Sequence, residues 1–363
     1  MTVQEPKYQK VIDWITGEIA NGSLKPGDRL MSEEKMSKKF DLCRQTIRRA
    51  TQELVERGIV VRVQGSGTYV GGMIPKTPKK RHMNVAVMST FYESYIFPPT
   101  FRGIEKELSR SGYSMQVSFT NNRISNETAI LKMLLERGNI DGLIAEPSKG
   151  ALPNPNIKYY KELLNRHIPV LFFNDVYPEL SVPCVRIDDW TFASEATKLL
   201  IEAGHKKIGG IFKLDDGQGH RRYAGYLSAV LKANLNTHSR QIFWIDTETQ
   251  GELKEQEEYL FRRLEGCTGV VCYNDQVAMQ VIDLAVKRGL RVPEDLSVVS
   301  IDDSELATIC QVPFTSVPHP KEKLGEKVAE NMVKMIENPA FDGNYIFGGE
   351  PVIRQSVQKK SNA

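Results

Sequence analysis

Residues 44–70, RQTIRRATQELVERGIVVRVQGSGTYV, decide the fold of the N-terminal part of the chain. Their first half places apolar side chains at the three-and-four spacing of an amphipathic helix, and Gly58 is a natural residue just beyond its end. The opposite face is polar and holds Arg44, Gln45, Arg48 and Gln52. In the second half, β-branched and aromatic residues flank a tip that reads Gln64-Gly65-Ser66-Gly67. This pattern predicts a helix followed by a β-hairpin.

Two more helices are predicted upstream of this stretch. Residues 8–20 carry apolar side chains at helical spacing. Ser32 can cap a second, short helix with Glu33 and Glu34 in its first turn, where the helix dipole favours acidic groups. Three helices and a ribbon within about 70 residues are typical of a winged helix-turn-helix domain, which we assign to residues 1–72. Residues 73–82, without periodicity and rich in Pro and Lys, read as a linker.

The rest of the chain alternates between short apolar runs and helical stretches. The runs form two series, residues 85–88, 115–119, 142–145 and 170–173, then residues 208–212, 269–273 and 296–301. Repeated β-α-β units imply parallel sheets with both faces covered. The fold class is therefore α/β, with two doubly wound lobes that would bind a ligand at the carboxyl ends of their strands.

Charge is distributed unevenly along the chain. Residues 1–82 hold 16 Lys and Arg against 9 Asp and Glu, whereas the other 281 residues hold 32 against 36. A basic end is the expected footprint of a unit that meets a polyanion. The five cysteines are odd in number and widely spread, the first residues lack the pattern of a signal peptide, and no apolar run is long enough to span a membrane. We expect a cytoplasmic protein that needs no metal or cofactor and no membrane partner.

The N-terminal segment Pro26-Gly27-Asp28-Arg29-Leu30, together with residues 44–50 and 64–70, resembles GntR-type winged-helix DNA-binding domains. The remainder is similar to the LacI/GalR family of sugar-responsive repressors, which are related to periplasmic binding proteins; the matching text includes Arg222-Tyr223-Ala224-Gly225-Tyr226, Tyr273-Asn274-Asp275 and residues 292–299. One family joins both halves, the L-arabinose-responsive repressors, which the chain resembles in Asp141-Gly142-Leu143-Ile144-Ala145-Glu146-Pro147 and Thr315-Ser316-Val317-Pro318-His319-Pro320.

This resemblance implies an effector-binding and dimerisation domain over residues 83–363. Its first lobe would comprise residues 83–187 and 317–341, and its second lobe residues 188–316 and 342–363. The chain departs from the GntR pattern at Met31, where proline is usual, and at Cys43, where Ser or Thr usually caps the recognition helix. Losing that cap would cost about 1 kcal/mol of helix stability.

The helix over residues 44–57 carries the side chains that suit base reading. Arg binds the guanine edge as a fork and Gln pairs with adenine, which makes Arg44, Gln45 and Arg48 the candidate readers. Glu33 could accept a hydrogen bond from cytosine or orient Arg44. The remaining candidates are phosphate contacts from Lys39, Thr46 and Arg49, and a wing tip in which Gly65 and Gly67 allow close approach while Gln64 reads the groove.

A protein binds a polyol through polar side chains that hydrogen-bond its hydroxyl groups, each as a fork, and through an apolar platform that packs against its C–H face. The resemblance places Arg222 as the fork, with hydroxyl partners Glu146, Asn174, Asn274 and Asp302. It places His319 near the hinge, Tyr95 and Phe97 as the platform, and Arg102 at the start of a helix of the first lobe. Simpler interpretations stay open: His319 could only brace the hinge, Phe97 could belong to the core, and structural roles as caps or turn residues suit Asp188, His205 and Asp303.

The family implies a repressor whose hold on double-stranded operator DNA falls when a sugar closes the cleft, with a homodimer matching a two-fold operator. L-arabinose as the effector rests on the resemblance alone, so a repressor that responds to a different sugar remains an alternative. A sugar-acting enzyme is a further alternative, but the chain has no nucleophile elbow, HExxH or Walker motif. A transport receptor would need an export signal and no basic DNA-reading unit.

Replacing Arg44 or Arg48 with alanine is expected to abolish sequence-selective DNA binding and leave the fold intact, because each removes a guanine-reading fork from an exposed helix face. Gel shifts at fixed salt against specific and scrambled duplexes measure this. Unchanged discrimination between the two duplexes would contradict base reading by these residues.

Overall fold

The chain divides into two units, Met1–Arg81 and His82–Ala363. The computed structural model describes residues 8–63, 66–71, 81–93, 96–236 and 238–360. The boundary between the two units falls near the end of the predicted linker in the sequence. Each unit is described by itself below.

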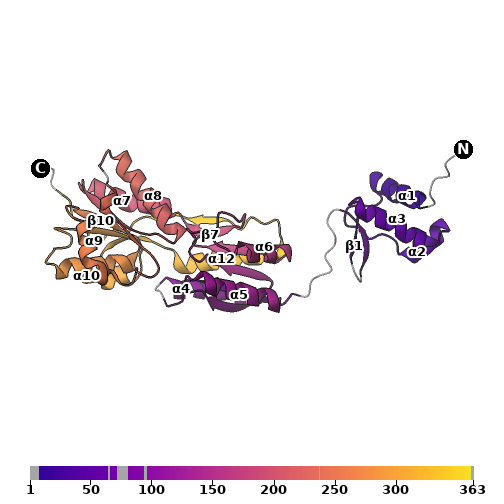
Figure 1. Ribbon diagram of the computed structural model, residues 1–363, viewed down its shortest axis with the longest axis horizontal. Helices are drawn as coiled ribbons and strands as arrows, with labels where there is room; N and C mark the ends of the chain where they lie inside the picture. The colour runs from indigo at the N-terminus through magenta and orange to yellow at the C-terminus, as the bar shows by residue number, and fades with distance from the viewer. Residues whose placement is uncertain (1–7, 64–65, 72–80, 94–95, 237, 361–363) are drawn as a thin grey trace. The chain divides into compact units, whose positions relative to one another are not determined.

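Over its described residues, the first unit has three helices and one antiparallel hairpin (Figure 1): α1 (Gln9–Ala20), α2 (Glu33–Phe40), α3 (Arg44–Glu56), β1 (Val60–Val63) and β2 (Gly67–Val70). The apolar sides of the three helices and of the hairpin meet in one core, which includes Val11, Ile15, Met36, Ile47, Leu54 and Val70. The winged helix-turn-helix predicted from residues 44–70 is therefore confirmed.

The helix ends follow their local sequence. Ser32 caps α2 by accepting the Lys35 N–H at 3.3 Å, and Asp41 ends this helix in the left-handed conformation. Cys43 makes no side-chain cap at the start of α3, as its departure from the family pattern predicts. The burial of Ile47, Ala50 and Leu54 holds α3 in place instead.

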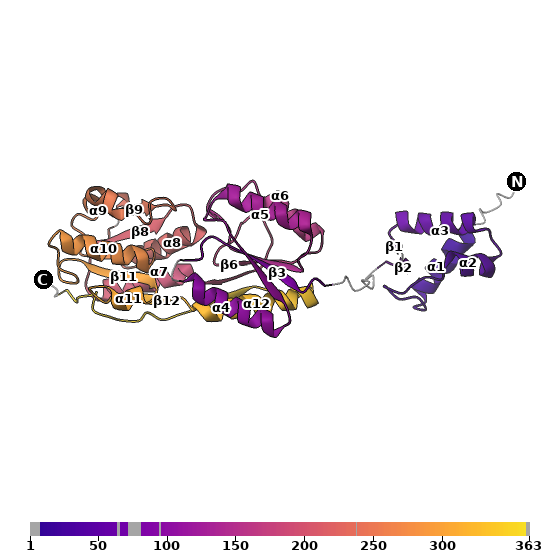
Figure 2. The same cartoon turned by 90° about the horizontal axis from the view of Figure 1, so that it is seen from below.

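The second unit begins with a lobe built on a six-stranded parallel sheet. Its strand order is β13-β7-β6-β5-β3-β4. The strands are β3 (Asn84–Ser89), β4 (Ser114–Phe119), β5 (Gly142–Ala145), β6 (Val170–Phe173), β7 (Cys184–Ile187) and β13 (Tyr345–Phe347). Helices α5 (Ile124–Arg137) and α6 (Ile157–Asn165) cover one face, and α4 (Phe97–Arg110) and α12 (Lys321–Glu337) cover the other (Figure 2).

The second lobe has a five-stranded parallel sheet in the order β12-β11-β10-β8-β9. Its strands are β8 (Ile208–Lys213), β9 (Ile242–Ile245), β10 (Gly269–Cys272), β11 (Ser297–Asp302) and β12 (Thr315–Pro318). Its helices are α7 (Asp189–Glu202), α8 (Gly217–Lys232), α9 (Glu257–Arg263), α10 (Asp275–Lys287) and α11 (Leu306–Ile309), with short 3-10 turns η1 (Ser239–Gln241) and η2 (Leu253–Gln256). The α/β class with two parallel sheets is confirmed.

The chain crosses between the lobes after β7, after β12 and after β13. The prediction that residues 342–363 belong wholly to the second lobe is wrong for β13, which pairs with β7 of the first sheet. The second crossing also lies slightly later than predicted, because β12 continues to Pro318. Beyond β13 the tail does reach the second lobe, where Val352 bridges to Ser316. Within the described residues, no helix is long and apolar enough to cross a membrane.

Helices α4 and α12 approach each other closely through two glycines. A Cβ atom on Gly103 would lie 2.2 Å from the carbonyl oxygen of Glu322, and one on Gly325 would lie 2.1 Å from that of Thr100. Both partners are backbone atoms, which cannot rotate away. The closeness of the two helices therefore depends on the absence of both side chains.

Replacing Gly103 or Gly325 with alanine is expected to lower the free energy of unfolding by roughly 1–3 kcal/mol, because the new methyl group must push the helices apart. Chemical denaturation of the full chain measures the change. Gly251→Ala is the matched control, since no described atom outside its chain neighbours lies within 4 Å of a Cβ at Gly251. A destabilisation no larger than that of the control would contradict the close approach as a constraint.

Candidate functional site

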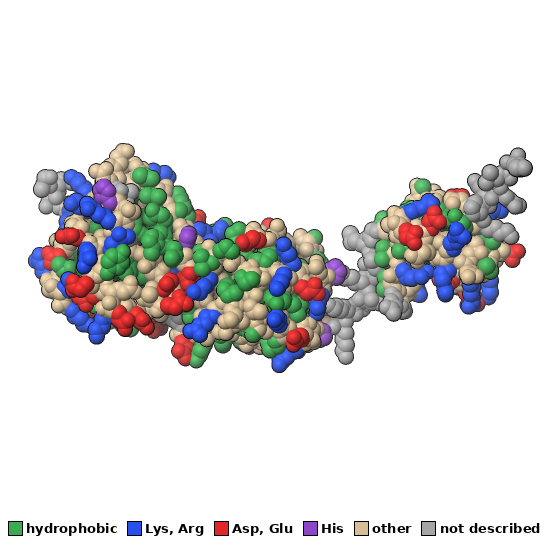
Figure 3. Space-filling view, in the orientation of Figure 1, with side chains coloured by type: hydrophobic (Ala, Val, Ile, Leu, Met, Phe, Trp, Pro, Cys, Tyr) green, Lys and Arg blue, Asp and Glu red, His purple; other side chains and the backbone are tan. Residues whose placement is uncertain are grey.

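The outer face of α3 presents the predicted DNA-reading side chains. The side chains of Arg44 and Arg48 are each 67% exposed, and Gln45 is exposed between them. Figure 3 shows Lys and Arg side chains gathered along one edge of this unit. The inner face of the same helix is buried in the core, so the helix presents its polar side to solvent.

Acidic residues of α2 hold these arginines in place. Glu33 lies 3.1 Å from Arg48 and 3.4 Å from Arg62 of β1, whereas Glu34 lies 3.5 Å from Arg44. The expectation that Glu33 orients Arg44 is therefore wrong, because Glu33 lies beside the next turn of α3. Arg62 was missed by the sequence analysis; its signal is an exposed Arg within an otherwise apolar strand.

Three of the other predicted DNA contacts, Thr46, Arg49 and Lys39, lie against neighbouring side chains of the same unit. The Thr46 hydroxyl lies 3.1 Å from the sulfur of Cys43, and this hydrogen bond lowers the pKa of that thiol. Arg49 lies 4.6 Å from the ring centre of Tyr8, and Lys39 lies 3.6 Å from that of Trp14. Gly67 has a φ of +134°, which favours glycine. Gln64 and Gly65 lie outside the described residues.

In the second unit, Arg222 is the centre of the predicted cleft and is only 2% exposed. Its Nε donates to Asp189 at 2.9 Å, its Nη1 donates to the carbonyl oxygen of Tyr273, and its Nη2 lies 3.6 Å from Asp302. The guanidinium also lies over the Tyr273 ring, 4.7 Å from its centre. Helix α8 supplies Arg222, and its partners lie in α7 and at the carboxyl ends of β10 and β11.

Glu146 and Asn174 follow neighbouring strands of the first lobe and form a pair. Asn174 Nδ2 donates to Glu146 Oε1 at 2.7 Å. The other oxygen of Glu146 accepts hydrogen bonds from Ser89 and from the backbone and hydroxyl of Thr90. Burial raises the pKa of Glu146, and the hydrogen bonds from Asn174 and Thr90 oppose that shift. The carboxylate is therefore held rigidly by four protein groups.

His319 connects this pair to the hinge. Its Nε2 lies 3.4 Å from Asn174 Oδ1, a carbonyl oxygen, so Nε2 carries the proton. Its Nδ1 is then an acceptor, and it is buried without a hydrogen-bond partner in the described part of the chain. Burial, with help from the charges of Lys321 and Arg222, lowers the pKa of His319 to about 3, which keeps the ring neutral.

The turn that carries Asp302 is strained. Asp302 and Asp303 have φ values of +119° and +43°, which residues other than glycine rarely adopt. The ammonium group of Lys321, at the start of α12, donates to the carbonyl oxygens of Asp302 at 2.6 Å and Asp303 at 2.9 Å. Lys321 belongs to the first lobe, so it braces this turn of the second lobe.

Three predicted cleft residues do not join this cluster as expected. Phe97 is 5% exposed and packs in the core against Phe91 and Phe101, so the core interpretation of this residue holds. Arg102 is exposed on α4. The side-chain oxygen of Asn274 accepts the Val277 N–H and caps α10. Tyr95 lies outside the described residues.

The structural interpretations of three other residues are confirmed. Asp188 caps α7 by accepting the Thr191 N–H at 3.1 Å. His205 is buried between the Thr268 hydroxyl and the carbonyl oxygen of Gln358. Asp303 lies in the turn after β11 and forms an ion pair with Arg354 at 2.7 Å.

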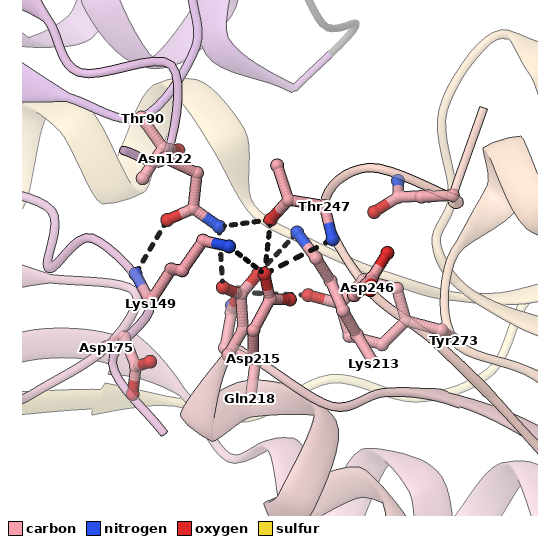
Figure 4. Close-up of polar contacts among 12 residues, drawn as sticks. Thr90, Asn122, Lys149, Asp175, Lys213, Asp215, Gln218, Asp246, Thr247 and Tyr273 are labelled. Atoms are coloured by element: carbon pink, nitrogen blue, oxygen red, sulfur yellow. Dashed lines mark hydrogen bonds and ion pairs between the residues drawn. The ribbon is translucent and has the colours of Figure 1, made fainter. Parts of the chain in front are cut away.

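A second polar cluster, missed by the sequence analysis, joins the two lobes directly (Figure 4). Asn122 of the first lobe donates to Asp216 at 3.0 Å and to Thr247 at 2.6 Å. Lys149 of the first lobe lies 3.1 Å from Glu248 and 3.5 Å from Asp215. The two lobes are therefore in direct contact through this cluster.

Beside this cluster lies a cavity of about 250 Å³. It is lined by Phe91, Tyr92, Glu93, Asn121 and Gln276, which come from both lobes. Phe91 and Tyr92 lie two and three residues after the end of β3 and line this space, so aromatic side chains do reach the region between the lobes. They are different rings from the predicted platform of Tyr95 and Phe97.

Comparison with known proteins matches a family model to each of the two units. Residues 7–70 match bacterial regulatory proteins of the gntR family, and residues 197–357 match the periplasmic binding protein-like domain. Among solved structures, the transcription regulator CcpA of Lactococcus lactis is 26% identical with a TM-score of 0.67, covering 76% of this chain and 99% of that one. A CelR–cellobiose complex, at 23% identity and a TM-score of 0.68, covers 86% and 90% and shows the shared fold.

Two curated relatives span almost the whole chain. An arabinose metabolism transcriptional repressor of Geobacillus stearothermophilus is 35% identical over 359 residues, 98% of each chain. One from Halalkalibacterium halodurans is 36% identical over 343 residues, 93% of this chain and 91% of its own. The chain belongs to the family of arabinose metabolism transcriptional repressors, with a GntR-type DNA-binding domain followed by a periplasmic-binding-like domain.

Proposed function

We propose that this repressor binds operator DNA through α3 and the wing, and releases it when L-arabinose occupies the cleft between the two lobes. The names of the two full-length relatives support the sugar class. We further propose that it acts in the cytoplasm as a homodimer on a two-fold operator, without a cofactor and without converting the sugar.

The observation that carries the proposal is the cluster of Arg222, Asp302, Asn174, Glu146 and His319. These five buried side chains come from both lobes. Four of them end or directly follow parallel strands, where such sheets bind ligands, and Arg222 reaches them from α8. The cluster combines a guanidinium fork, fixed carboxylates and one buried acceptor without a partner, His319 Nδ1. A sugar hydroxyl is a donor that would satisfy that acceptor.

Release of DNA follows from linkage. If the sugar prefers the closed lobes and the operator prefers another arrangement of the dimer, each ligand weakens the binding of the other by the same factor. The DNA-reading residues and the cleft lie in separate units of the chain, so the two ligands do not compete for a site.

Calorimetric titration of the full chain with a panel of pentoses and hexoses tests the ligand. We expect heat with L-arabinose, recovery of the sugar unchanged, and release of an operator duplex selected in vitro from random sequences. Heat with another sugar and none with L-arabinose would overturn the assignment of the effector. Failure of every sugar to release the duplex would overturn the repressor mechanism.

The neutral state of the His319 ring predicts how the affinity for the sugar depends on pH. Protonation would turn Nδ1 from an acceptor into a donor, so affinity for the sugar is lost as the pH falls through the pKa of this group. Because that pKa is about 3, we expect constant affinity from about pH 8 down to about pH 5, unlike an ordinary histidine. Titrations across this range measure it. A decline centred near 6.5 that disappears in His319→Gln would contradict a neutral His319.

A further inference from the structure

Arg221, the neighbour of the sugar-site fork Arg222, joins the two lobes. It lies in α8 of the second lobe, and its side chain is 25% exposed. Its Nη1 donates to Asp175 Oδ1 at 3.0 Å, and its Nη2 donates to the carbonyl oxygen of Asn174 at 3.2 Å. Both acceptors belong to the first lobe, and Asn174 is one of the clustered cleft residues.

On its own lobe, Arg221 shares one carboxylate with Arg222. Asp189 is fully buried. Its Oδ1 accepts from Arg222 Nε at 2.9 Å, and its Oδ2 accepts from Arg221 Nε at 3.2 Å and Nη2 at 3.1 Å. A shift of either guanidinium therefore pulls on the other through a single rigid group.

The carboxylate of Asp175 packs tightly against the first residue of α8 in the second lobe. Its Oδ2 accepts the N–H of Gly217, the first residue of α8, at 2.8 Å. A Cβ atom on Gly217 would lie 2.5 Å from Asp175 Oδ1 and 3.0 Å from Arg221 Nη1. This contact exists only when the lobes are together, because its two sides belong to different lobes.

Because Asp175 is buried, its contact with the second lobe is favourable only while Arg221 pairs with it. Desolvation raises the pKa of this carboxyl, and the charge of Arg221 opposes the shift. A buried charge that loses its partner is costly, whereas water solvates both partners once the lobes separate. The closed arrangement therefore requires the Asp175–Arg221 pair to be complete.

We propose that Arg221 is a positioning residue that couples the two halves of the sugar site. It ties Asn174 of the first lobe to the Asp189–Arg222 pair of the second, so that lobe closure, and with it sugar affinity, depends on a side chain that does not itself touch the sugar. This inference rests on the proposed function.

Calorimetry of the full chain with L-arabinose, or with whichever sugar of the panel binds the wild type, tests the coupling. Arg221→Gln and Asp175→Asn are expected to weaken sugar binding about tenfold or more, within the usual range of coupling between sites. Arg221→Lys should be intermediate, because an ammonium group cannot bind Asp175 and Asp189 as a fork. Operator affinity without sugar should equal or exceed that of the wild type in all three variants, because weaker closure cannot disfavour DNA under the proposed linkage, whereas a general loss of structure would lower it.

Gly217→Ala tests the same contact without removing a charge. Alanine favours the helix at this position, yet its methyl group would displace the Asp175 carboxylate from Arg221, so sugar affinity should again fall about tenfold. Gly251→Ala, in open space on the same lobe, should bind sugar like the wild type. The double variant Arg221→Gln/Asp175→Asn should lose little more affinity than either single variant, because both changes break one contact.

Wild-type sugar binding combined with affinities within about twofold of wild type in Arg221→Gln and Gly217→Ala would overturn the role of Arg221 and leave the proposed function standing, because ordinary coupling between sites exceeds that factor. Binding of no sugar by the wild type would overturn the proposed function, and this inference with it.

Discussion

The structure of the larger unit depends on charge held in a place that water does not reach. Arg222 is almost fully buried, and a guanidinium can remain there only if its hydrogen bonds and its charge are matched. Asp189 and the carbonyl oxygen of Tyr273 provide that match, with Asp302 nearby. Each partner comes from a different strand end or helix start, so the pairing fixes how these elements meet.

The same principle explains the rigidity of the first-lobe side of the cleft. Four protein donors hold Glu146, one of them from Asn174, whose own carbonyl oxygen faces His319. In this network, His319 Nδ1 stays buried without a hydrogen-bond partner among the described residues. Lys321 adds to this order by bracing the strained turn at Asp302 from the other lobe.

In the DNA-reading unit the important charges are exposed to solvent, in contrast to the buried Arg222. Its arginines are exposed, and their ion pairs with Glu33 and Glu34 are of the solvent-facing kind that adds little stability. Their effect is on orientation, because Glu33 holds a side chain of α3 and one of the wing strand side by side. The surface is thus ordered by weak pairs that DNA phosphates and bases can replace.

Sequence alone determined the domain types, the two parallel sheets, the outward face of α3, and the caps at Ser32 and Asp188, because each of these follows from local periodicity or from hydrogen bonds within a few residues. It also pointed to Arg222, Asp302, Asn174, Glu146 and His319, which the structure brings together from both lobes. Only the tertiary structure decided the sheet to which β13 belongs, the burial of Phe97, and the use of Asn274 as a cap. The contacts of Arg221 and Lys149 across the lobes were likewise beyond local pattern. The physical reason is that edge-strand pairing, ring burial and ion pairs between lobes depend on which distant segments become neighbours, and the spacing of residues along one helix or strand carries no record of that.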